Sequence, residues 1–190
     1  MYGGFSFMIR LILLNDNHHS RTPIIKLFLL KFLTMFKDLD KQQIESVMAE
    51  NILGRLGCHA DGKTYVVPVS YAYDGKYIYV RSFEGLKISM MRKNPNVCFQ
   101  VDSFEDMADW KSVITWGVFE ELTNEEERND GLKILINRIL PGISSETMKI
   151  SPAWPFPTHD YTKIEGIVFR IRLTEKTGRC EKLDPKFYKK

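Results

Sequence analysis

Residues 64–94 alternate between hydrophobic and polar positions in a way that predicts two strands, a tight turn and a helix. Successive strand residues point to opposite faces, so every second side chain shares a face. The larger hydrophobic side chains of the first strand share one face in this way: Tyr65, Val67, Val69, Tyr71 and Tyr73. Asp74-Gly75 then favours a hairpin, because a type I′ turn needs positive φ at both central residues. The return strand is residues 76–81.

At Ser82 the period changes, and this serine can cap a helix that Asn94-Pro95 ends. Glu84 and Gly85 would then lie in the first turn, with Lys87 close behind. Unpaired N–H groups and the helix dipole favour a phosphate at such an N-terminus, and Lys87 would add a full charge. The alternative is an ordinary strand-to-helix junction with a serine cap and a solvated lysine.

The rest of the chain predicts four more strands and two more helices. The predicted elements are a helix that Asp40 and Gln43 cap and that ends near Asn51, strands at 52–59, 96–103, 111–122 and 165–174, and a helix from a Thr123–Glu126 capping box to Pro141-Gly142. Six antiparallel strands with peripheral helices favour a small barrel, because closure removes the sheet edges. Strand 111–122 is apolar on both faces, so we expect a helix or a second subunit to cover its outer face.

The domain organisation follows from composition. Residues 1–34 hold two apolar clusters and form either an N-terminal extension, with the biological start at Met35, or a helix on a membrane surface. Each cluster is shorter than the ~20 residues of a membrane span. We expect a folded domain at 35–182 and a charged tail at 183–190. Residues 143–163, rich in proline and aromatics, would form a lid, a partner contact or a segment packed across a barrel end.

Composition narrows the function classes. The chain has 190 residues, 44% hydrophobic and 27% charged, as in globular proteins. Its net charge of +3 arises in residues 1–34, so the body has no basic stripe and nucleic acid is not expected as a partner. Three cysteines without CxxC spacing and four histidines without ligand spacing indicate no disulfide, no metal site and a reducing cytoplasm. No nucleophile-base constellation is visible.

Six segments in this order carry a resemblance to a known family. They are ILGRLG (52–57), YVVPVSYAYDG (65–75), YIYVRS (77–82), EGLKI (84–88), RKNPNVCFQV (92–101) and WKSVITWG (110–117). Residues 35–182 resemble the pyridoxamine 5′-phosphate oxidase-like FMN-binding split-barrel family, and within it the nitroimidazole-resistance-related branch.

The resemblance implies a mainly β fold, a six-stranded antiparallel split β-barrel with peripheral helices, as a homodimer with one FMN at each of two subunit interfaces. It places Val67, Pro68, Val69 and Ser70 along the isoalloxazine. It places Arg81, Ser82 and Lys87 at the FMN phosphate. Lys111 and Ser112, on the fifth strand, would reach the flavin across the dimer.

The implied function is that of an FMN-dependent oxidoreductase acting on a small-molecule substrate with a nicotinamide electron donor. A flavin carrier or sensor without turnover is one alternative, and a haem-binding split barrel with His59 or His159 as axial ligand is another. The chain departs from the family at two places. Thr177-Gly178-Arg179-Cys180 does not supply the Arg-x-His substrate motif of pyridoxamine-phosphate oxidases, and Arg81 stands where several nitroimidazole-resistance proteins have histidine.

Overall fold

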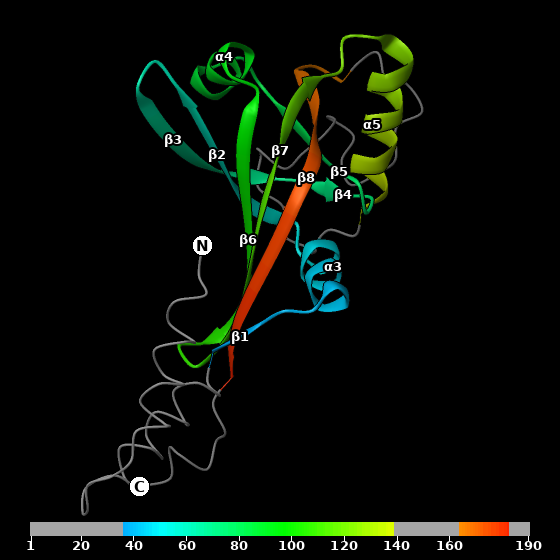
Figure 1. Cartoon of the computed structure of the whole chain (residues 1–190). Helices are drawn as coiled ribbons and strands as arrows, with labels where there is room; N and C mark the ends of the chain where they lie inside the picture. Colours follow the sequence, from blue (N-terminus) through cyan, green and yellow to red (C-terminus); the bar gives the residue numbers. More distant parts are fainter. Residues whose placement is uncertain (1–35, 139–163, 183–190) are drawn as a thin grey trace, which may run out of the picture.

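The computed structural model describes residues 36–138 and 164–182, which form one antiparallel sheet with three helices around it (Figure 1). In chain order the elements are β1 (Phe36–Asp38), α3 (Lys41–Glu50), β2 (Leu53–Ala60), β3 (Lys63–Ser70), β4 (Ala72–Tyr73), β5 (Tyr77–Ser82), α4 (Leu86–Lys93), β6 (Asn96–Asp106), β7 (Asp109–Glu121), α5 (Glu125–Asn137) and β8 (Ile167–Lys182).

The strand order shows that this sheet closes on itself. Its path is β3-β2-β6-β7-β8-β5-β4, with β1 paired to β8. Strands β3 and β4 stand at opposite ends of that path, yet only Tyr71 separates them along the chain. The sheet must therefore curve round until its two ends meet, which confirms the expected split barrel. The sheet has eight strands rather than six, because the first predicted strand breaks at Tyr71 and β1 adds another.

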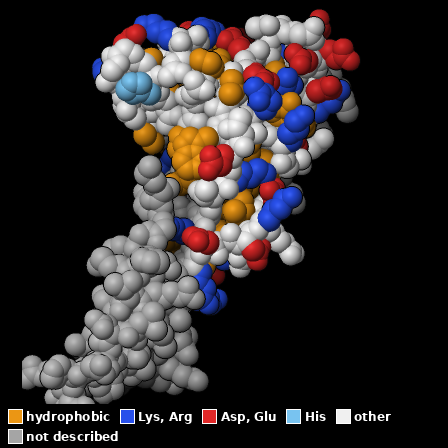
Figure 2. Space-filling view, in the orientation of Figure 1, with side chains coloured by type: hydrophobic (Ala, Val, Ile, Leu, Met, Phe, Trp, Pro, Cys, Tyr) orange, Lys and Arg blue, Asp and Glu red, His pale blue; other side chains and the backbone are white. Residues whose placement is uncertain are grey.

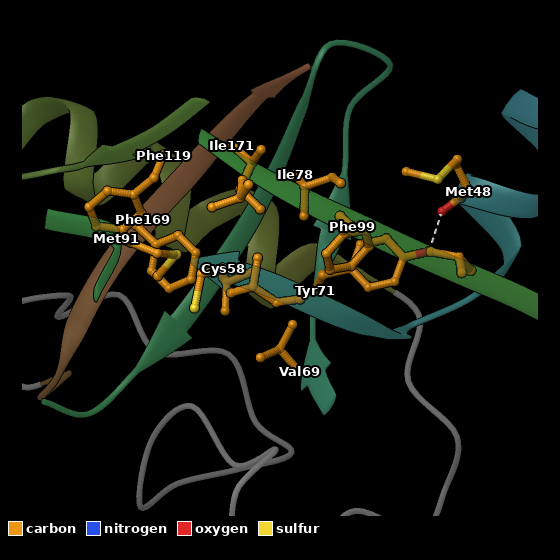
Figure 3. Close-up of a cluster of buried hydrophobic side chains, with 14 of the residues drawn as sticks. Met48, Cys58, Val69, Tyr71, Ile78, Met91, Phe99, Phe119, Phe169 and Ile171 are labelled. Carbon is orange, nitrogen blue, oxygen red and sulfur yellow. Dashed lines mark hydrogen bonds between the residues drawn. The ribbon is translucent and has the colours of Figure 1, made fainter. Parts of the chain in front are cut away.

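Tyr71 occupies this break as part of the main core (Figure 3). Its side chain is fully buried, and its ring packs edge to face on the Phe99 ring with 5.0 Å between the ring centres. Its hydroxyl donates a hydrogen bond to the Met48 carbonyl at 2.7 Å. Its N–H donates to the Ile52 carbonyl at 3.0 Å. Burying the ring and satisfying both polar groups fixes the chain where it passes from one end of the sheet to the other.

The predicted alternation is confirmed. Val69 and Tyr71 lie in the main core, with Tyr65, Val67 and Tyr73 packed against it. A second, smaller cluster lies under α5 and contains Ala72, Tyr79, Leu122, Leu132, Leu135, Ile164 and Val168. Strand β8 serves both clusters, since Phe169 faces the first and Val168 the second.

Helix ends agree with the sequence at one place and differ at others. Asp40 caps α3 as predicted, with Gln43 N–H donating to its carboxylate at 2.8 Å and the Gln43 side chain accepting from Asp40 N–H at 3.0 Å. For α5, Asn124 rather than Thr123 is the cap and accepts from two backbone N–H groups. That helix ends at Asn137, before the predicted stop at Pro141-Gly142, which lies outside the described residues.

Three strands are longer than predicted. The strands predicted at 96–103 and 111–122 extend into the tip of the β6–β7 hairpin, where Phe104 pairs with Trp110. The strand predicted at 165–174 continues to Lys182, and its second half, from Glu175, pairs with β7 as part of β8. Long exposed strand ends with charged side chains resemble loops in a sequence, because only their backbone pairing identifies them. Within 36–138 and 164–182, no helix is both long and apolar enough to cross a membrane.

Candidate functional site

The junction between β5 and α4 holds the residues predicted to bind phosphate. Ser82 ends β5 opposite Ile167, and its hydroxyl donates to the Phe83 carbonyl at 3.1 Å. Ser82 is therefore not the helix cap that the sequence predicted. Gly85 takes that position, and the helix begins at Leu86 without any side-chain cap. Within the described ranges, no side chain therefore accepts hydrogen bonds from the first-turn N–H groups of α4.

Lys87 lies in this first turn and is half-buried. Its amino group forms no hydrogen bond and no ion pair with any residue in the described part of the chain. Burial raises the pKa of the Cys58 thiol on β2, and the charge of Lys87 opposes that shift. An uncapped helix N-terminus with an unpaired lysine is a favourable setting for an anion.

Arg81 stands beside the junction and is partly buried. Its Nε donates to the Glu165 carbonyl at 2.7 Å, and its guanidinium lies 4.9 Å from the centre of the Phe83 ring. Burial lowers the pKa of Arg81, and the nearby charge of Arg128 lowers it further. Gly166 keeps the chain close here, because a Cβ at that position would lie 2.7 Å from the Ser82 carbonyl oxygen.

The four residues predicted to line the flavin ring lie on strand β3, and their side chains point alternately toward the core and away from it. Val67 and Val69 face the core, so only Pro68 and Ser70 direct side chains away from it. The Ser70 hydroxyl oxygen is buried and has no hydrogen-bond partner among the described residues. A buried, unpaired hydroxyl costs free energy of roughly 1–3 kcal/mol, and a ligand could remove that cost by pairing with it. In the described sheet β3 also pairs on one side only, with β2.

The sheet surface turned away from the core, which we call the outer face, carries a connected polar network. Its members are Arg55, Gln100, Asp102 and Ser112, and the register aligns Arg55 with Gln100 and Asp102 with Ser112. Arg55 Nη1 lies 2.5 Å from Asp102 Oδ1, and Gln100 Nε2 donates to Asp102 Oδ1 at 2.7 Å and to Ser112 Oγ at 3.1 Å.

Hydrophobic side chains surround this network. Leu53, Val66, Ile114 and Trp116 are exposed on the same face, at 53%, 60%, 37% and 41%. On the side of the molecule seen in Figure 2, hydrophobic side chains gather over the sheet. A groove of about 860 Å³ adjoins the face along β7 and β8, with Ser112, Ile114, Trp116 and Arg179 in its lining.

The predicted site residues therefore fall into two groups. Arg81, Ser82 and Lys87 gather at the β5–α4 junction, whereas Ser112 lies on the outer face and Lys111, one residue away, is exposed on β7. Ser82 pairs with Ile167 of β8 and Ser112 with Arg179. Those partners are twelve residues apart, or roughly 40 Å at about 3.3 Å per strand residue. One chain does not bring Ser82 and Ser112 to the same small molecule.

Three network members, Arg55, Gln100 and Asp102, were not among the sequence candidates. The alternation in β6 contained a signal for two of them, because Val97, Phe99 and Val101 point inward. Gln100 and Asp102 must then point outward. Their contact with Arg55, 45 and 47 positions away, depends on the pairing of β2 with β6.

Of the two histidines proposed as haem ligands, the structure describes His59. His59 is exposed at the end of β2, and its Nδ1 lies 3.1 Å from Thr64 Oγ1. No group of three or more His, Cys, Asp or Glu side chains in 36–138 and 164–182 could hold a metal ion. His159 lies outside these ranges.

The fold and the junction define a split-barrel protein with a candidate anion site at a helix N-terminus. Comparison with known proteins gives the family. Residues 40–180 match the sequence profile of the pyridoxamine 5'-phosphate oxidase family, so the chain belongs to that family. This finding confirms the resemblance that the six sequence segments carry.

Individual relatives agree with this membership. The structure of a FAD-binding protein from Mesorhizobium loti is 31% identical, covers 76% of this chain and 97% of its own, and superposes with a TM-score of 0.58. A candidate 5-nitroimidazole antibiotic resistance protein from Bacteroides thetaiotaomicron shares the fold, with 20% identity, 87% and 96% coverage and a TM-score of 0.57.

An uncharacterized protein from Rhizobium meliloti is 38% identical over 84 residues, which are 44% of this chain and 56% of that protein. The chain thus matches about half the length of this curated relative.

Proposed function

We propose that this protein binds FMN between two copies of the chain and acts as a flavin-dependent oxidoreductase on a small-molecule substrate. The observation that carries the proposal is Lys87, whose amino group has no partner among the described residues and lies in the first turn of a helix that none of their side chains caps. A phosphate there would accept hydrogen bonds from helix N–H groups and from Lys87. Ser82 ends β5 at this junction, and Arg81 precedes it with its side chain bonded to the Glu165 carbonyl.

The residues proposed to contact the ring system fit a flavin as well. The Ser70 hydroxyl is buried without a partner in the described structure, and a ring nitrogen or carbonyl oxygen would supply one. The unpaired side of β3 offers backbone N–H and C=O groups next to it, except at Pro68, which has no N–H. We therefore propose that Val67, Pro68, Val69 and Ser70 line the isoalloxazine.

A homodimer reconciles the two groups of residues. The β8 partners of Ser82 and Ser112 are roughly 40 Å apart along the strand, too far for both serines to contact one flavin. Lys111 and Ser112 would therefore reach the flavin bound by the partner subunit. The exposed Leu53, Val66, Ile114 and Trp116 would be covered in such a dimer. Covering apolar area of this kind stabilises association.

Bound flavin would supply hydride transfer at N5, and the chain would bind, orient and shield it. A nicotinamide nucleotide is the proposed electron donor. Oxidation of pyridoxamine phosphate is not proposed, because β8 carries Thr177 to Cys180 where an Arg-x-His motif would be needed. Cys58, Cys98 and Cys180 are free, in keeping with a cytoplasmic protein.

Extraction of the cofactor tests the binding proposal. We expect the purified protein to be yellow and to release FMN on heating, identified by chromatography against FMN and FAD standards. A colourless protein that takes up neither nucleotide would contradict the proposal. Release of FAD, which the Mesorhizobium loti relative binds, would correct FMN to FAD.

Turnover is tested separately, by anaerobic stopped-flow mixing of the yellow protein with NADH and NADPH. Rapid bleaching of the flavin is the expected result. A flavin that neither nucleotide reduces would instead favour the carrier or sensor.

A further inference from the structure

We infer that Gln100 is a positioning residue that makes the Ser112 hydroxyl a hydrogen-bond donor toward the flavin of the partner subunit. This inference rests on the proposed function, and it concerns the direction of one proton. Neither Gln100 nor the two side chains that orient it belongs to the set of residues that the family resemblance assigns to the cofactor.

The chemistry of its neighbours fixes the amide of Gln100. A guanidinium can only donate hydrogen bonds, so the Gln100 atom that faces Arg55 Nη1 at 3.3 Å must be Oε1. An ionised carboxylate can only accept, so the atom that faces Asp102 Oδ1 at 2.7 Å must be Nε2. Both neighbours demand the same orientation, and the short contact between Arg55 and Asp102 holds them together.

With the amide in this orientation, Ser112 has one role left. Gln100 Nε2 directs one N–H to Asp102 and the other to Ser112 Oγ at 3.1 Å. Ser112 therefore accepts from Gln100, and its own proton is available for another acceptor. Ser112 also lines the groove along β7 and β8, so a ligand there could accept that proton. The network thus prepares a donor before the ligand arrives, which reduces the cost of ordering on binding.

A donor matters for a flavin because two-electron reduction places extra negative charge on N1 and on the carbonyl oxygens of the ring, whereas N5 gains a hydrogen. A hydroxyl that donates to one of these atoms binds the reduced ring more tightly than the oxidised ring. Loss of that donor should therefore lower the reduction potential. A hydroxyl that accepts from the ring would have the opposite preference, so the direction of the proton can be measured.

Three variants separate the direction of the proton from packing. Gln100→Glu keeps the shape but replaces the donor amide by a carboxylate, which takes up the Ser112 proton and removes it from the flavin. Gln100→Met removes the amide without creating an acceptor, so Ser112 can still rotate and donate. Ser112→Ala removes the hydroxyl. Asn96→Asp, the same amide-to-acid change at an exposed position of β6, is the charge control.

The experiment measures the FMN dissociation constant and the midpoint potential of each variant with FMN added in excess. We expect Gln100→Glu and Ser112→Ala to bind reduced FMN about tenfold more weakly relative to oxidised FMN, which is a fall of about 30 mV for a two-electron couple. In a double variant that combines Gln100→Glu with Ser112→Ala, the midpoint potential should fall no further than in either single variant. Gln100→Met and Asn96→Asp should change the ratio by less than about threefold, or under 15 mV by the same conversion.

Three results would overturn the inference: an unchanged potential in Gln100→Glu, equal falls in Gln100→Glu and Gln100→Met, or additive effects in the double variant. The failure of the proposed function itself is distinguishable, since the unmodified protein would then bind no flavin. Circular dichroism of each variant shows whether it folds. If the extra acid of Gln100→Glu prevents folding, Ser112→Ala still tests the inference, because an unchanged or raised potential in that variant would mean that the Ser112 hydroxyl does not donate to the flavin.

Discussion

Arg92 binds Glu121 through two hydrogen bonds, from Nε at 2.7 Å and from Nη2 at 2.9 Å, and its Nη1 lies 2.9 Å from Glu84. Basic residues at a helix C-terminus often do no more than complement the dipole. Arg92 instead ties the end of α4 to the end of β7 and to the loop that leads into α4. The position of the proposed phosphate site thus depends on an ion pair at the opposite end of the helix.

Lys87→Ala should weaken FMN binding by roughly ten- to a hundred-fold, because a charge-assisted hydrogen bond contributes ~1.5–3 kcal/mol and ~1.4 kcal/mol is a factor of ten. The measurement is a fluorescence titration of apoprotein with FMN. Lys93→Ala is the matched control, since Lys93 pairs with Asp61 at 2.5 Å at the far end of the same helix. Equal affinities for the two variants would mean that the phosphate binds elsewhere. Arg92→Ala is not a neutral control, because it frees Glu84 beside the site.

Acid should weaken the Arg92–Glu121 pair in a defined direction. The hydrogen bonds from Arg92 hold the pKa of the Glu121 carboxyl below its ordinary value of 4.5. A carboxyl with a lowered pKa in the folded state stabilises the fold above its unfolded pKa and loses that contribution as the pH falls through the folded pKa. Glu121→Gln should therefore melt at a lower temperature than the unmodified protein near pH 7, and the difference should shrink below about pH 4.5.

Thermal unfolding at several pH values checks this, with Glu105→Gln as a control at an exposed acid of β6 that forms no ion pair with any described residue. A melting difference for Glu121→Gln that stays constant or grows in acid would show that the charge of Glu121 does not stabilise the fold.

Ser70→Ala should change stability and cofactor binding in opposite directions. Removal of a buried hydroxyl without a partner should leave the apoprotein equally or slightly more stable, by up to about 1 kcal/mol. If the flavin satisfies that hydroxyl, the same change should weaken FMN binding by about three- to tenfold. Denaturant unfolding of the apoprotein and an FMN titration supply the two values. A variant that loses stability and keeps its FMN affinity would mean that Ser70 stabilises the fold and does not contact the flavin.

Trp116→Glu should separate the proposed dimer. Trp116 is 41% exposed beside Ile114 on the outer face, and a charge there would have to be buried in the interface, which is unfavourable. Light scattering should report a monomer, and FMN affinity should fall with it because Lys111 and Ser112 would no longer reach the partner's flavin. Glu125→Lys, at the exposed start of α5, should leave the dimer intact. A Trp116→Glu dimer with normal flavin content would exclude this face as the interface.

A chain that begins at Met35 should fold and bind FMN like the full chain. It keeps β1, whose Phe36 to Asp38 pair with Glu181 to Arg179 of β8, and it keeps every strand of the described sheet. Melting temperature and flavin content per chain are the measurements. A marked loss of either would show that residues 1–34 belong to the folded domain.

The sequence alone determined the local elements whose side-chain pattern is strong. The alternation of Val67, Val69 and Tyr71 predicts a strand facing the core, and Asp40 with Gln43 predicts a helix start, because both signals involve residues within a few positions of one another. Lys87 could be recognised in the same way, as a lysine shortly after a strand. The family resemblance also lay in the order of short segments, which a linear sequence preserves.

Tertiary structure decided the rest, for reasons that a linear pattern cannot contain. Ser82 resembles a helix cap in the sequence, but its pairing with Ile167 extends β5, and the helix starts only at Leu86. The break at Tyr71 became visible only when β3 and β4 were found at opposite ends of one sheet. Arg55 and Asp102 are 47 positions apart, and only the register of β2 with β6 brings them within 2.5 Å. Contacts of this kind depend on strand pairing across the whole chain, whereas the sequence signals used for prediction extend over a few residues.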